Sequence, residues 1–89
     1  MPSISMFYGI VIYMFFDDNK QHKKPHIHAV YGDNKAVFDI EDAEILSGKF
    51  PHKETKHVQS WIFLRQKELM ANWQLAVNSE TPYKIEPLR

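Results

Sequence analysis

The sequence contains no cysteine among its 89 residues, and this absence excludes disulfide bonds, zinc ribbons, iron–sulfur clusters and thiol catalysis. It also has no net charge, because eleven basic side chains balance eleven acidic ones, so no overall field attracts it to nucleic acid or an anionic membrane. The longest stretch without a charged side chain, residues 2–16, is shorter than the roughly twenty residues of a spanning helix, and it lacks the features of a signal peptide. We therefore expect a soluble, cytoplasmic protein with no membrane segment.

The composition is that of a self-folding chain, since 44% of the residues are hydrophobic and 25% are charged. Residues 1–89 are predicted to form a single domain. Its first part, residues 1–50, is rich in β-branched and aromatic residues, whereas residues 51–78 contain few helix breakers. Residues 79–89 form a linker-like tail. This order predicts an α+β domain.

Residues 3–16 have strand chemistry but are too long for one strand of so small a domain, so we expect a bend or bulge at Gly9. Both faces of residues 10–16 are apolar, which is typical of a central strand covered on two sides. A hairpin is predicted with Asp33 and Asn34 as its turn, and residues 43–46 are a possible fourth strand.

This hairpin turn fixes a predicted register between its two strands. On one face the pairs are Tyr31 with Ala36, Ala29 with Phe38 and Ile27 with Ile40; on the other they are Val30 with Val37, His28 with Asp39 and His26 with Glu41. The first face is apolar, and the second places two imidazoles opposite two carboxylates.

Apolar residues after Pro51 recur at helical spacing, in either one helix of about 25 residues or two helices bent at Arg65 and Gln66. The predicted fold is a small antiparallel sheet of three or four strands, covered on one face by this long C-terminal helix or helix pair. Trp61, Ile62, Leu69 and Trp73 should pack on the apolar hairpin face. The second sheet face would stay partly open, so we expect a homodimer or a partner there.

The His26-Ile27-His28 step places two imidazoles on one face of a strand. Together with Asp39 on the opposite strand, His26 and His28 are candidate catalytic residues, so the three candidates are His26, His28 and Asp39. The structural alternative is a solvated sheet face on which histidines and acidic residues pair across strands. We predict neither a bound metal nor a cofactor.

Two basic clusters flank the predicted hairpin, one in residues 20–26 and one in residues 49–57. If they converge, Lys23, Lys24 and Lys53, together with His26 and His28, could bind a protein partner or the phosphates of RNA. The alternative is that these lysines are simply solvated.

Several short segments carry a family resemblance: residues 2–10, Pro25-His26-Ile27-His28-Ala29, Tyr31-Gly32, Ala36-Val37-Phe38 and Asn72-Trp73. Together they resemble the small bacterial family of domain of unknown function 4160. The resemblance implies no established activity, and it implies a gene often placed beside that of another short protein, in a suspected toxin–antitoxin-like arrangement. Only His26 and His28 match the family motif as candidate site residues.

Two functions are therefore predicted. The first is a non-catalytic partner-binding module of a two-component, toxin–antitoxin-like system. The alternative is a small metal-independent ribonuclease-like toxin, in which His26 or His28 transfers protons and a lysine holds phosphate.

Overall fold

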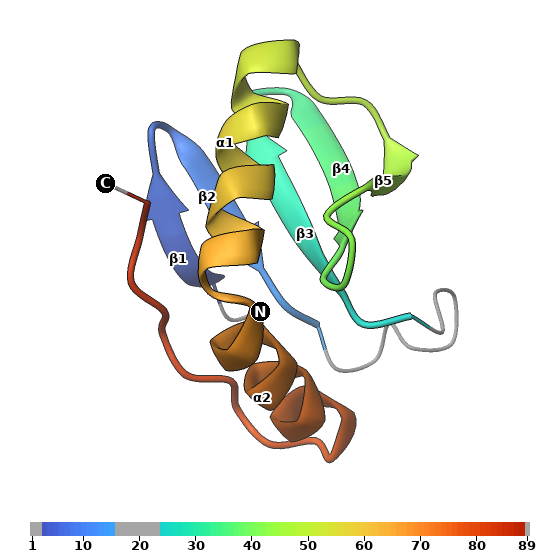
Figure 1. Ribbon diagram of the computed structural model, residues 1–89, viewed down its shortest axis with the longest axis vertical. Helices are drawn as coiled ribbons and strands as arrows, with labels where there is room; N and C mark the ends of the chain where they lie inside the picture. Colours follow the sequence, from blue (N-terminus) through green and yellow to red (C-terminus); the bar gives the residue numbers. More distant parts are fainter. Residues whose placement is uncertain (1–2, 16–23, 89) are drawn as a thin grey trace.

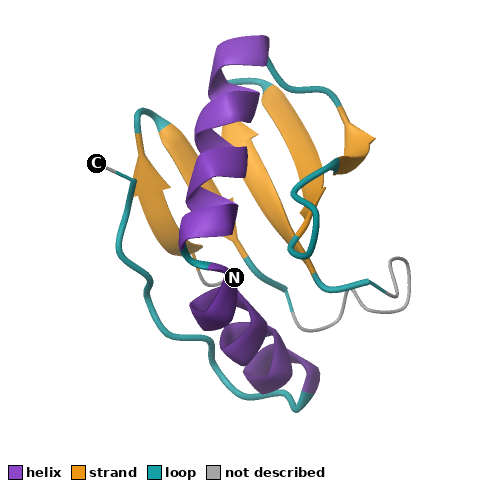
Figure 2. Cartoon of the chain, in the orientation of Figure 1, coloured by secondary structure: helices purple, strands orange, loops and turns teal. Residues whose placement is uncertain are grey.

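The computed structural model describes residues 3–15 and 24–88, which form one sheet and two helices (Figures 1 and 2). The strands pair in chain order, each antiparallel to the next. The elements are β1 (Ser3–Phe7), β2 (Ile10–Tyr13), β3 (His26–Tyr31), β4 (Asn34–Asp39), β5 (Ile45–Gly48), α1 (His52–Leu64) and α2 (Gln66–Val77). The predicted α+β class is confirmed, but the sheet has five strands and not three or four.

The extra strand comes from a complete chain reversal at Gly9, where we expected only a bend or bulge. Tyr8 and Gly9 have φ values of 50° and 78°, and Phe7 pairs with Ile10 across the turn. Positive φ at both central residues is the signature of the type I′ turn that joins the tightest hairpins. Residues 3–15 therefore supply two strands within the described chain.

The turn between β3 and β4 lies one residue earlier than predicted, and this moves every cross-strand partner by two residues. Gly32, with φ 58°, and Asp33 form the turn, and Tyr31 pairs with Asn34. Glycine takes this backbone conformation without steric cost, whereas a turn at Asp33 and Asn34 would need a residue with a side chain there. Because each cross-strand partner moves by two residues, an even number, every side chain stays on its predicted face of the sheet.

Strand β5 begins at Ile45, later than the predicted residue 43, because a tight turn precedes it. Asp39 O accepts a hydrogen bond from Ala43 N, and Ala43 has φ 62°. At the other end of β5, a Cβ on Gly48 would lie 2.3 Å from Lys35 O, so only glycine allows β5 to approach β4 this closely.

The helix-pair alternative is confirmed, since the helical segment is interrupted at Arg65 (φ −112°, ψ 24°). Figure 1 shows α1 lying across one face of the sheet and α2 lying beyond one end of it. Neither helix in the described chain has the length and apolarity needed to cross a membrane.

The core forms between α1, α2 and the sheet face turned toward them. Trp61, Ile62, Leu69 and Trp73 are buried there together with Ile27, Ala29, Phe38 and Ile40, as the hydrophobic pattern predicted. Burial of these side chains is the main force that holds the helices on the sheet.

The tail is fixed to this core, although its composition resembles a linker. Trp61 Nε1 donates a hydrogen bond to Glu86 O at 2.8 Å, and Asn72 bonds both the N–H and the carbonyl of Tyr83. Ile85 N donates to Ile4 O, which places the tail along the outer edge of β1.

Replacing Trp61 by alanine should lower the free energy of unfolding by about 3–5 kcal/mol, because it removes a fully buried aromatic side chain and leaves a cavity. Phe63→Ala, on the exposed side of the same helix, is the control and should change stability by less than about 0.5 kcal/mol. Urea denaturation followed by circular dichroism measures both. Equal losses would show that α1 presents a different side to the sheet.

Candidate functional site on the sheet

His26 and Asp39 lie opposite each other on β3 and β4, and each is only 1% exposed. His26 Nδ1 lies 2.8 Å from Lys24 O, and its ring centroid lies 4.8 Å from that of Trp73 on α2. The imidazole is thus packed into the structure at the end of the sheet next to α2.

The buried Asp39 carboxylate holds the turn that follows β4. Its Oδ1 accepts a hydrogen bond from Glu41 N at 2.7 Å. Its Oδ2 lies 3.7 Å from Lys24 Nζ, but the Lys24 side chain is 64% exposed. A long ion pair with such a solvated partner contributes little, so the hydrogen bond to the turn is the stronger interaction.

His28 occupies the opposite sheet face from the core, and its neighbours differ from those predicted. It pairs with Val37 on β4 and Tyr13 on β2, and its ring centroid lies 4.4 Å from that of Phe15. The predicted pairs of His28 with Asp39 and His26 with Glu41 are therefore wrong. The two-residue change of register pairs Asp39 with His26 instead.

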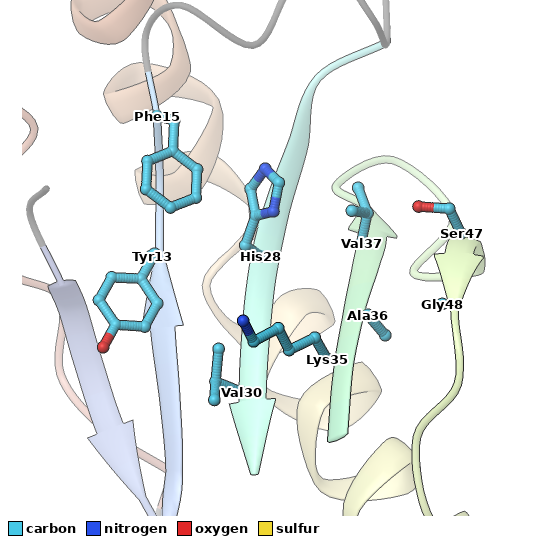
Figure 3. A pocket seen from close by; sticks show the side chains of 9 residues that line it. All are labelled: Tyr13, Phe15, His28, Val30, Lys35, Ala36, Val37, Ser47 and Gly48. Atoms are coloured by element: carbon cyan, nitrogen blue, oxygen red, sulfur yellow. The ribbon is translucent and has the colours of Figure 1, made fainter. Parts of the chain in front are cut away.

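His28 lines a hollow of about 510 Å³ on this face, which we call the open face because no described element covers it. Figure 3 shows this side, with the helices behind the sheet. The hollow is lined by Tyr13, Phe15, His28, Val30, Lys35, Ala36, Val37, Ser47 and Gly48. Its lining comes from four adjacent strands and from Phe15, just after β2, and it is mainly apolar, which is typical of a binding surface.

The predicted basic residues do not form one site in the described chain. Lys24 precedes β3 at the end of the sheet near α2, whereas Lys53 lies in the first turn of α1 at the opposite end (Figure 1). Lys23 lies outside the described residues. Within the described ranges, no three His, Asp or Glu side chains are grouped as a metal ion requires.

Sequence reasoning did not select the residues that surround His28 on the open face. Tyr13 and Phe15 have ring centroids 6.0 Å apart and planes only 6° from parallel, and Lys35 reaches across the hollow (Figure 3). The signal was present in the apolar side chains on both faces of residues 10–16. The sequence pattern did not contain the strand order and register that bring residues of β4 and β5 to the same hollow.

Residues 9–74 match the family model described as Domain of unknown function (DUF4160), which covers more than half of the chain. The chain belongs to this family. No curated protein and no solved structure matches it. The matched part of this DUF4160 protein runs from the β1–β2 turn to just beyond Trp73, so it contains His26, Asp39 and every residue that lines the hollow.

In this DUF4160 protein, Asp39→Ala should cost about 1–3 kcal/mol of stability, because Glu41 N–H loses its buried acceptor. Asp39→Asn keeps an oxygen in that place and loses only the solvated Lys24 pair, so it should cost less than about 1 kcal/mol. Urea denaturation distinguishes the two. An equal cost for both variants would show that the negative charge, and not the hydrogen bond, is what the fold needs.

Proposed function

We propose that this protein is a non-catalytic binding module that docks a partner protein on its open face. The partner is the short protein encoded beside it, and the pair forms a two-component, toxin–antitoxin-like bacterial system. The proposed binding function requires neither a metal nor a cofactor.

The observation that carries the proposal is the apolar character of the open face. Its side chains include Val11, Tyr13, Val30 and Val37, on strands whose other face is already packed against the helices, and Phe15 just after β2. A sheet that is apolar on both faces gains stability when both are covered. A second protein laid over this face would bury these side chains and displace water from the hollow.

The ribonuclease-like alternative is less well supported by the same geometry. It needs an accessible imidazole beside a phosphate-binding lysine. His26 is 1% exposed and packs against Trp73, and Lys53 lies at the far end of the sheet from it. His28 and Lys35 do line one hollow, but the rest of its lining is mainly apolar, which favours a protein surface over an RNA backbone.

Val30→Glu should abolish co-purification with the co-expressed neighbouring protein, because it places a charge in the centre of the open face. The loss of affinity should be at least about thirtyfold, as for a central interface residue. Val77→Glu makes the same change on an exposed position of α2 and should leave the complex intact. Size-exclusion chromatography and calorimetry measure both variants, and circular dichroism verifies their folding.

An RNA cleavage assay on each component provides the opposing test. The isolated chain should leave single-stranded RNA intact, alone and in the complex. Cleavage by the isolated chain that disappears in His28→Ala would contradict the non-catalytic assignment. Co-purification that survives Val30→Glu would move the docking surface away from the open face.

A further inference from the structure

The hollow on the open face, which we call the trough, lies over β3 and β4 and between β2 and β5. One side is lined by Tyr13 at the end of β2 and by Phe15 just after it, and the other side by Ser47 and Gly48 on β5. Side chains of β3 and β4 form the floor between them (Figure 3). Four adjacent strands span three interstrand distances of about 4.8 Å, or roughly 14 Å. An α-helix with its side chains is about 10–12 Å across and fits this width.

The backbone of the sheet favours a helical occupant for the same trough. The N–H and C=O groups of β3 point along the sheet toward β2 and β4, with which β3 pairs on both sides. An occupant of the face therefore receives side-chain contacts but no backbone hydrogen bonds. An extended segment would lose hydration of its own backbone without compensation, whereas a helix satisfies its backbone internally.

The charge of the trough identifies the chemistry of the occupant. Lys35 carries the one permanent charge among the described residues that line it, and none of these residues is acidic. In a two-fold dimer through this face, a second copy would bring another Lys35 to the face, and no described lining residue of that copy is acidic. A partner with an acidic side chain opposite Lys35 would complement the charge of this lysine.

From these three observations we infer that the occupant is an amphipathic α-helix of the partner, with its apolar side in the trough and an acidic residue facing Lys35. This inference rests on the proposed function and specifies which part of the partner binds. Aliphatic floor residues such as Val30 and Val37 suit the apolar side of a helix, and the single cation is a poor match for a nucleic acid backbone.

The test uses fluorescein-labelled synthetic peptides of 18 residues, because a helix of that length, about 27 Å, is longer than the roughly 20 Å that the six residues of β3 span. The first peptide has leucines at helical spacing flanked by glutamates. The second has the same composition with leucines at alternating positions, and the third replaces each glutamate of the first by lysine. Fluorescence anisotropy with the full chain should show about tenfold tighter binding of the first peptide than of either other.

Two substitutions locate the binding and test its charge preference. Lys35→Glu should reverse the order of affinity, so that the lysine peptide binds more tightly than the glutamate peptide. Because Lys35 is exposed, the fold tolerates this change. Lys67→Glu makes the same substitution on an exposed position of α2 and should leave the order unchanged. Val30→Glu should weaken binding of the first peptide.

Other results would overturn the inference. Equal binding of the alternating peptide, or an order unaffected by Lys35→Glu, would exclude the acidic helix. Tighter binding of a twelve-residue oligouridylate would indicate base stacking on Tyr13 and Phe15. A dimer in light scattering that Val30→Glu dissociates would make a second copy the occupant. If the neighbouring protein co-purifies but the peptides do not bind, the helical occupant is rejected and the proposed function stands. If the first peptide binds but the neighbouring protein does not co-purify, only the two-protein assignment is rejected.

Discussion

One constraint determines the architecture: the sheet is apolar on both faces, but the described chain supplies helices to only one. Alternation along β3 sends Ile27 and Ala29 toward α1, and His28 and Val30 toward the other side. The break at Arg65 then carries α2 beyond the sheet end, where it packs on His26 and does not extend the helical cover. The hollow exists because the described helices cover only one face of the sheet.

The hydrophobic pattern predicted the fold class, the core residues and the sidedness of the sheet, because alternation depends only on the period of a strand. It did not predict the strand count or the pairing. Tyr8 adopts a positive φ that is unusual for an aromatic residue, so the first hairpin turn was not recognised. For the second hairpin, Gly32 competed with Asn34 as a turn residue, and a shift of two residues leaves the hydrophobic alternation unchanged.

The same ambiguity explains why the candidate site was predicted only in part. His26 and Asp39 were chosen for their chemistry, and the structure gives both a buried place, with the carboxylate bound to a turn. His28 was chosen for the same reason and does border a hollow. The residues that give this hollow its shape come from β2, β4 and β5, so recognising them required long-range pairing that no local pattern contains.

The tail also has a consequence for assembly. The tail covers part of the outer edge of β1, because Ile85 N donates a hydrogen bond to Ile4 O and Lys84 Nζ donates to Ser3. In the described chain, β5 forms the other margin, and no strand pairs beyond it. A further strand is therefore hindered at β1 near Ile4, and β5 is the less covered margin in the described chain. The tail thus works against open-ended sheet growth, the kind that leads to fibres, at one of the two margins.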